Sequence, residues 1–313
     1  MNKFSHYLSV TVKGVCMGAA DVIPGVSGGT IAFLMGIYGE LVDSIKSVNP
    51  HSLKLLFTGK LARFWKHING NFLLSLILGI LISVFSLAKL MKYLMENQPI
   101  QLWSFFFGLI LASAVFILKG IDKWNIKNIL SLAVGIVAAA FICFATPAET
   151  PNHLWFIFLC GAIAICAMIL PGISGSFILL LMGKYDFIMS AVAGLDVKIL
   201  IIFGCGALIG IVLFSHFLSW LLKRFYMQTI ALLAGFMIGS LFKVWPWKEL
   251  LDKGTDIPVL PGTYAQITGS RPLLEYAVIF AVIGIVALIV IELLANNKEK
   301  EEEKEKELKN NSL

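Results

Sequence analysis

Charged residues are scarce in this 313-residue chain, at 14% of the total, whereas hydrophobic residues make up 58% and the mean hydropathy is +0.86. Soluble globular proteins carry about a quarter charged residues and about half apolar ones. So little charge cannot cover a water-exposed surface, which excludes an ordinary soluble protein. The apolar residues also form long blocks, including 72–88, 102–118 and 277–291, each close to the length of a membrane-spanning helix.

The chain also lacks the cysteine and leader patterns of metal-binding or secreted proteins. None of its five cysteines forms a C-x-x-C motif, and all lie in apolar segments. We therefore expect packing cysteines, no metal and no cofactor. The first apolar stretch contains Lys13 and runs into a Gly/Pro-rich motif rather than a small-residue cleavage site, so no cleavable signal peptide is expected.

What the chain does contain is an internal repeat. The sequence from Pro24 reads PGVSGGTIAFLMGIY, and the sequence from Pro171 reads PGISGSFILLLMGKY, at a constant offset of 147. Downstream the offset falls to 127, which pairs Gly79 with Gly206. The difference of 20 residues falls in a polar insertion at about 46–71. Because repeats determine architecture, this duplication is the basis of the fold prediction.

The repeat predicts an all-α polytopic membrane protein made of two halves, each a motif segment followed by three transmembrane helices. The first half is placed at 1–147, with its motif segment at about 8–45, and the second at 148–295. Residues 296–313 form a mixed-charge tail that is expected to be disordered and cytoplasmic. The predicted spans are 72–92, 101–118, 128–146, 199–222, 229–245 and 273–294.

Positive charge in the loops predicts how the halves are oriented. Five basic residues and no acidic one lie between Ser44 and Phe72, and basic residues also gather at 119–127 and 223–224. If each motif segment is a re-entrant helical hairpin, all three groups lie on one side with both termini; if each crosses as a broken helix, the first group faces outward. The positive-inside rule favours the hairpins and cytoplasmic termini. Three spans per half then give two inverted-topology repeats, with a site at their interface.

The motif itself is suited to binding an anion. Proline followed by glycine stops a helix, and a new apolar helix is expected to begin near Ser27 and near Ser174. A helix N-terminus offers free N–H groups and partial positive charge, which favours phosphate. The alternative is that the glycines only permit close packing of the two segments. The candidate phosphate-binding residues are Pro24, Gly25, Ser27, Gly28, Gly29, Thr30, Pro171, Gly172, Ser174, Gly175 and Ser176.

Few other polar residues lie inside the apolar segments. Asp21 precedes the first motif, and Met168 holds its place in the second. The acid either binds a coupling proton or sodium ion or caps a helix. Lys89 and His216 occupy equivalent positions near span ends, where each either attracts a phosphate head group or extends to the interface. Lys184, just beyond the second motif helix, is expected to be an interfacial charge.

The stretch 17–38, MGAADVIPGVSGGTIAFLMGIY, resembles the signature of the PopT-type polyprenyl-phosphate transporter family, and the motif from Pro171 resembles it as well. The similarity extends over about 4–292. The resemblance implies transport of undecaprenyl phosphate from the outer to the inner leaflet of the bacterial cytoplasmic membrane. That movement recycles the lipid carrier for peptidoglycan and other envelope polymers. The resemblance carries over the motif positions and Asp21 as functional residues.

Three other functions compete with this interpretation. An ion-coupled transporter or channel for a small anion would use the same broken helices; a lateral opening to lipid would favour the carrier lipid instead. A phosphatase needs acid/base groups and a metal or nucleophile. The motif offers only Asp21 and hydroxyls, so no enzyme activity is expected. A purely structural role is the third alternative. It does not explain why the chain contains polar breaks in its membrane helices, which lower stability. The expected partners are a polyprenyl phosphate, membrane lipids and a coupling ion, and no nucleic acid.

Overall fold

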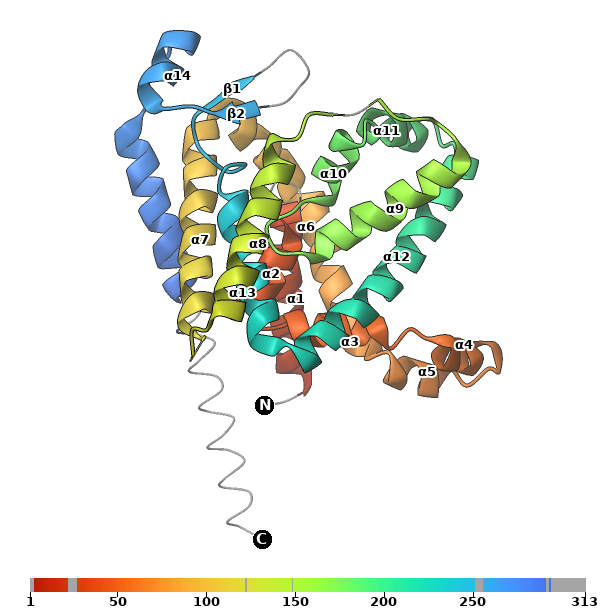
Figure 1. The fold of residues 1–313 in the computed structure, drawn as a ribbon. Helices are drawn as coiled ribbons and strands as arrows, with labels where there is room; N and C mark the ends of the chain where they lie inside the picture. The colour runs from red at the N-terminus through yellow and green to blue at the C-terminus, as the bar shows by residue number, and fades with distance from the viewer. Residues whose placement is uncertain are drawn as a thin grey trace.

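The computed structural model describes residues 3–21, 27–121, 123–147, 149–250, 256–290 and 293. Within these ranges the chain is mostly helical, with one antiparallel β-hairpin (Figure 1). The elements are α1 (Lys3–Asp21), α2 (Gly28–Leu34), α3 (Tyr38–Lys46), α4 (Pro50–Phe57), α5 (Leu61–His67), α6 (Gly70–Asn97), α7 (Pro99–Lys119), α8 (Ile126–Phe144), α9 (Leu154–Ile169), α10 (Gly175–Leu181), α11 (Tyr185–Ala193), α12 (Val197–Arg224), α13 (Tyr226–Ser240), β1 (Lys248–Leu250), β2 (Asp256–Pro258), α14 (Pro261–Thr268) and the helix Leu274–Val290.

Four helices in the described ranges, α6, α7, α8 and α12, are long and apolar enough to cross a membrane. The helices α9, α13 and Leu274–Val290 are shorter and apolar. The described structure is thus mostly helical, with four candidate spans, or five if the bent pair α10–α11 counts as one, which agrees with the predicted polytopic membrane protein. The predicted tail at 296–313 lies outside the described residues.

The predicted span 229–245 is too long at its end. The helix α13 stops at Ser240, and residues 241–244 form turns in which Lys243 N donates to the carbonyl of Ser240. Pro246 follows, and proline disfavours helical dihedrals at the residue before it. The apolar run in the sequence continues through these turns, so hydropathy alone could not locate the helix end.

The helix boundaries reproduce the sequence repeat. The short helices α2 and α3 begin and end 147 residues before α10 and α11, and α6 begins and ends 127 residues before α12. The turns within the motifs also match, with φ of 69° at Gly36 and 60° at Gly183. Glycine adopts this left-handed region without strain. Both halves therefore fold in the same local way.

Glycines bring equivalent helices into backbone contact in the two halves. A side chain on Gly14 of α1 would overlap the carbonyl oxygen of Leu76 in α6. In the second half, a side chain on Gly161 of α9 would overlap the carbonyl oxygen of Phe203 in α12. These pairs are related by the same two offsets as the sequence motifs. Small residues permit such close helix packing in membranes.

The third apolar helix of each half packs against the other half. Gly108 of α7 lies against the backbone of Ala281 in the helix Leu274–Val290, and Gly235 of α13 lies against that of Leu132 in α8. Each half therefore contributes its third apolar helix to a helix pair with the other half.

Two glycines of α12 provide a matched test of this packing. A side chain on Gly206 would overlap the carbonyl oxygen of Phe158, whereas Gly204 faces open space. Gly206→Ala is expected to lower the free energy of unfolding by about 1–3 kcal/mol through overpacking. Gly204→Ala is expected to be neutral or to stabilise by up to about 1 kcal/mol, because alanine favours helix. Thermal unfolding of both variants in the same detergent measures the difference; equal melting temperatures would contradict the close contact.

The insertion and the β-hairpin lie at opposite ends of the molecule. Figure 1 shows α4 and α5 at one end, with α3 beside them, and β1, β2, α14 and α11 at the other. We refer to these as the α4–α5 end and the β-hairpin end. The helix α1 begins, and the helix Leu274–Val290 ends, toward the α4–α5 end (Figure 1). The repeat-related helices α3 and α11 therefore lie at opposite ends.

Lys184, which the sequence suggests is an interfacial charge, is buried within the protein rather than solvated. Its residue surface is only 3% exposed. Its ammonium donates to the carbonyl of Thr150 at 2.7 Å and lies 5.9 Å and 6.0 Å from the ring centroids of Phe156 and Phe187. The carbonyl and the two ring faces take the place of water around the charge. This loop contact could not be predicted from the position of Lys184 after the motif.

Candidate functional site

The two motif segments are in contact with each other. The hydroxyl of Ser27 donates to the carbonyls of Met168, at 3.0 Å, and Leu170, at 3.2 Å. The N–H of Gly172 donates to the Thr30 hydroxyl at 2.9 Å. Ser27 and Thr30 are almost completely buried. The structure therefore brings together the motif positions that the sequence places 147 residues apart.

Ser27 also begins the helix α2. Its backbone is extended, with φ of −116° and ψ of 131°, and its side-chain oxygen accepts from the N–H of Gly29 at 3.1 Å. This is N-capping, which satisfies one of the free donors at a helix start. One hydroxyl thus both caps α2 and binds the other half. Gly29 makes this approach possible, because a side chain there would overlap the carbonyl of Ile169.

Asp21 lies at the same helix start. Its carboxylate accepts from the N–H of Gly28 at 2.7 Å, across the break between α1 and α2. A side chain on Gly28 would come within 2.5 Å of this carboxylate. The sequence leaves two roles open for Asp21, binding a coupling ion or capping a helix. The hydrogen bond to Gly28 is a capping contact. The position that the sequence offers to a phosphate is filled here by the protein's own anion.

The second motif is arranged differently. Ser174 precedes α10 with extended backbone, and its hydroxyl pairs with that of Ser176 at 2.7 Å rather than capping the helix. Met168, which holds the place of Asp21, lies against Gly175. Gly172 has φ of +87°, a conformation that favours glycine. At the position where the first half places the Asp21 carboxylate, the second half therefore places a thioether. The starts of α2 and α10 differ in charge for this reason.

The remaining predicted residues do not join this contact in the described structure. Pro171 is buried beside Gly172. His216 lies in α12, where its Nδ1–H donates to the carbonyl of Val212 at 2.8 Å, in its own helix. Pro24 and Gly25 lie outside the described residues, and so does the side chain of Lys89, although its backbone belongs to α6.

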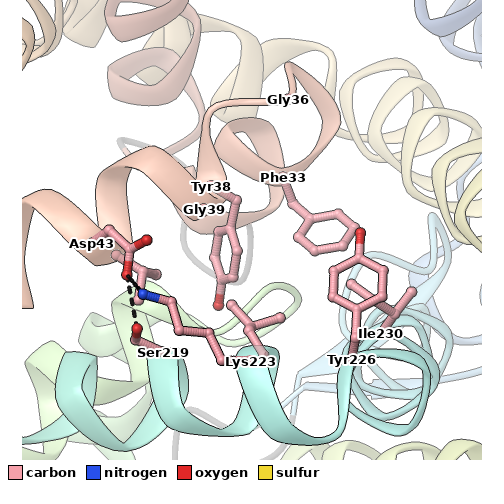
Figure 2. A pocket seen from close by; sticks show the side chains of 11 residues that line it. Phe33, Gly36, Tyr38, Gly39, Asp43, Ser219, Lys223, Tyr226 and Ile230 are labelled. Carbon is pink, nitrogen blue, oxygen red and sulfur yellow. Dashed lines mark hydrogen bonds and ion pairs between the residues drawn. The ribbon is translucent and has the colours of Figure 1, made fainter.

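A cavity of about 430 Å³, with a cluster of polar side chains in its otherwise largely apolar lining, lies between the first motif and α12. Figure 2 shows Lys223 and Ser219 of α12 turned toward Asp43 of α3, with Tyr38 nearby. The carboxylate of Asp43 accepts from the Ser219 hydroxyl at 2.7 Å and lies 3.4 Å from the Lys223 ammonium. Lys46 also donates to Ser219, at 3.0 Å. This network fixes the first motif's second short helix against the other half.

A second cavity, of about 570 Å³, has mostly apolar walls. It lies between α1, α6, α7 and the helix Leu274–Val290. Its apolar lining includes Leu102, Phe105, Phe106, Phe280 and Ile283, with Gln98 and Gln101 as polar members. Such a surface suits a hydrocarbon chain rather than a hydrated ion.

A family model described as undecaprenyl phosphate translocase-like matches residues 17–258, which include both motifs. The chain belongs to this family. The Vibrio cholerae protein named polyprenyl-phosphate transporter is 48% identical over 263 residues, covering 82% of this chain and 85% of that protein. A Staphylococcus aureus protein of the same name is 33% identical over 253 residues, covering 75% of this chain and 85% of that protein. No solved structure matches the chain significantly.

Membership of the undecaprenyl phosphate translocase-like family confirms the resemblance seen in the motif at 17–38. The matched region also contains a buried charge cluster that sequence reasoning missed. Lys243 follows α13, Lys248 lies in β1 and Asp256 lies in β2, with side chains that are 11%, 12% and 17% exposed. Lys243 pairs with Asp256, and the Lys248 ammonium lies 3.1 Å from the other oxygen of the same carboxylate.

Aromatic rings cover both lysines of this cluster. The Lys243 ammonium lies 4.2 Å from the ring centroid of Phe177 in α10, and the Lys248 ammonium lies 3.5 Å from that of Trp103 in α7. The cluster sits outside the membrane-spanning helices, and burial lowers the pKa of Lys248 to about 8 although Asp256 opposes the shift. Burial would raise the pKa of Asp256, but Lys248 and Lys243 together hold it below its usual range. The only signal in the sequence is two lysines flanking the short segment Trp245–Trp247.

Proposed function

We propose that this protein moves undecaprenyl phosphate, or a closely related polyprenyl phosphate, from the outer to the inner leaflet of the bacterial cytoplasmic membrane. The observation that carries the proposal is the buried contact between the two motifs, Ser27 with Met168 and Leu170. The relatives named polyprenyl-phosphate transporter suggest the substrate class. Returning the carrier to the inner leaflet would supply peptidoglycan and envelope polymer synthesis.

We infer that the two halves are inverted repeats. The matching helix boundaries and glycine contacts support a common fold for the halves. The placement of α3 and α11 at opposite ends supports their opposite orientation (Figure 1). In this arrangement α4 and α5 face the cytoplasm with both termini, because their segment carries the excess of basic residues. Each motif segment would then enter the bilayer from its own side as a re-entrant hairpin.

The contact between the motifs is closed in this conformation. The Ser27 hydroxyl and the Gly28 N–H, which the sequence assigns to phosphate, are bonded to protein groups. A phosphate that reaches this point must displace the Asp21 carboxylate and separate Ser27 from Met168. The displaced carboxylate then needs a proton or a sodium ion, since an unpaired charge inside the bilayer is costly. We propose that this exchange couples ion binding to opening of the interface.

The isoprenoid chain needs a path that stays apolar throughout. The cavity of about 570 Å³ offers aromatic and aliphatic walls between helices that face lipid. This feature favours a carrier lipid over a small inorganic anion, which would need a hydrated passage. The phosphate would then cross between the motifs while the chain remains among apolar side chains or in the bilayer.

The direct test reconstitutes the purified protein in liposomes and measures exchange between leaflets. Undecaprenyl phosphate is expected to exchange rapidly, whereas the neutral polyprenol of the same chain length is expected to exchange at the protein-free rate. The reason is that the motif donors recognise the phosphate rather than the chain. Equal rates for both lipids, or transport of inorganic phosphate alone, would reject the proposed function.

Removing the motif hydroxyls is expected to slow this exchange. Ser27→Ala loses a helix cap and the one hydroxyl donation that Met168 and Leu170 share, each worth about 1 kcal/mol, and 1.4 kcal/mol corresponds to a tenfold change. We expect exchange to fall about tenfold in Ser27→Ala and further in the double variant with Ser174→Ala. Thr268→Ala, at an exposed hydroxyl of α14, is the control. Full activity of the folded double variant would remove the hydroxyls from the mechanism.

A further inference from the structure

Among the residues that the structure describes, the β-hairpin end carries more buried positive charge than buried negative charge. Lys243 and Lys248 share the single carboxylate of Asp256, and all three side chains are more than four-fifths buried. The described groups of the cluster therefore leave an excess of one positive charge. A buried charge without a partner is strongly destabilising, so an excess ammonium at this position favours a further anion.

Lys248 is the group with unused binding capacity. An ammonium has three donors. Its Nζ is buried and lies 3.1 Å from the Asp256 carboxylate, and it meets no other hydrogen-bond acceptor among the described residues. On its other side is the ring of Trp103, which attracts the charge but accepts no conventional hydrogen bond. The lysine is thus held in place by Asp256 and Trp103, while the donors that do not face Asp256 have no acceptor among the described residues.

The cluster is also next to the second motif. Lys243 lies over the ring of Phe177, and Phe177 directly follows Ser176, whose hydroxyl pairs with Ser174. Figure 1 shows β1 and β2 at the same end of the molecule as α11, which continues the second motif. A ligand held by the lysines would therefore be close to α10, the motif helix that has no acid at its start.

We propose that Lys243 and Lys248 form a binding site for a phosphate monoester at the β-hairpin end. Asp256 is the internal anion that holds the two ammonium groups in position and competes with the ligand for them. A phosphate monoester carries more than one negative charge near neutral pH and offers three acceptor oxygens. It therefore compensates the excess charge and takes up the donors of Lys248.

The natural ligand rests on the proposed function. If the protein moves a polyprenyl phosphate inward, the β-hairpin end faces outward, and the lysines receive the head group from the outer leaflet. The site would then load the substrate before it reaches the contact between the motifs. The binding of a phosphate monoester does not depend on this step, so the two ideas can be tested separately.

The test measures binding of butyl phosphate, a soluble phosphate monoester, to the purified full-length protein by calorimetry. Lys248→Gln and Lys243→Gln are each expected to weaken binding about tenfold or more, because each removes from the site a buried positive charge that would pair with the phosphate. Lys248→Arg retains the charge and is expected to bind. Lys198→Gln, at an exposed lysine where α12 begins, is the matched control and is expected to bind like the wild type.

Asp256→Asn distinguishes a binding site from a structural ion pair. As the competing anion is removed, butyl phosphate is expected to bind about tenfold more tightly, although the variant loses an ion pair. If the cluster only anchors the β-hairpin, Asp256→Asn and Lys248→Gln both lower the melting temperature and leave the affinity unchanged. That result, or weaker binding by folded Asp256→Asn, would overturn the proposal.

Competition then identifies the source of the phosphate. Undecaprenyl phosphate in nanodiscs is expected to displace butyl phosphate, whereas the neutral polyprenol is not. Displacement by inorganic phosphate but not by the lipid would overturn the assignment to a lipid head group. If the proposed function fails, the wild type still binds butyl phosphate but shows no leaflet exchange. If the site fails, Lys248→Gln exchanges the lipid at the wild-type rate.

Discussion

Replacing Gly29 by alanine is expected to abolish leaflet exchange almost completely, with a loss of about a hundredfold or more. The added Cβ would overlap the carbonyl of Ile169 and come within 2.8 Å of that of Met168. Both carbonyls belong to backbone, which cannot turn aside as a flexible side chain can. Overpacking of this kind costs about 1–3 kcal/mol, and 2.7 kcal/mol is a hundredfold change in an equilibrium. The added methyl group separates the Ser27 hydroxyl from its two acceptors, so the contact between the two motifs can no longer form.

The control for Gly29→Ala is Gly262→Ala, in a helix outside the predicted spans where the added methyl group meets open space. It is expected to leave both exchange and thermal stability unchanged. Circular dichroism and size-exclusion chromatography establish that Gly29→Ala still folds before its transport is measured. A folded Gly29→Ala variant that exchanges lipid at the wild-type rate would show that closure of the two motifs is not part of transport.

The parts of the site that could be predicted are those set by local chemistry. The P-G-x-S-G pattern predicts a helix break and a serine at the start of the next helix, and Ser27 caps α2 as such a residue does. The offset of 147 residues likewise predicts the boundaries of α10 from those of α2. The sequence also suggests that the two motifs meet, because an inverted repeat brings its motif segments to one interface.

The partners of the motif donors could not be predicted. Asp21 reaches the N–H of Gly28 across a helix break, and the geometry of such a break depends on dihedral angles that residue types do not determine. The acceptors of Ser27 are carbonyls of Met168 and Leu170, and every residue has a carbonyl. Side-chain pattern therefore identifies which residues can donate but gives no information about which backbone group accepts.

The charge cluster was missed for a different physical reason. Charges in a loop between apolar helices are usually solvated, and the lysines and acids of 246–272 nearly balance. The antiparallel register, in which Lys248 is opposite Pro258 and Leu250 is opposite Asp256, places Lys248 and Asp256 diagonally across the hairpin, and the ring of Trp103 covers Lys248. A three-residue strand has too short a pattern for its pairing to be read from sequence.

Replacing Asp21 by alanine is expected to reduce leaflet exchange about a hundredfold, because a hydrogen bond to a charged group contributes about 1.5–3 kcal/mol. The variant leaves the Gly28 N–H without its acceptor and removes an acid that lies beside the contact of the motifs. Asp21→Asn is the informative partner, since its side-chain oxygen can still accept from Gly28 but carries no charge. Exchange is measured for both variants over a range of pH and sodium concentration.

If Asp21 only caps α2, Asp21→Asn retains most activity and the same dependence on pH and sodium as the wild type. If the carboxylate binds the coupling ion when phosphate displaces it, Asp21→Asn no longer responds to the concentration of that ion, even where some exchange remains. Met168→Asp adds a complementary test, because it places an acid at the equivalent position beside Gly175. A carboxylate there would compete with phosphate at the second motif, so Met168→Asp is expected to slow exchange while the response to the ion through Asp21 persists.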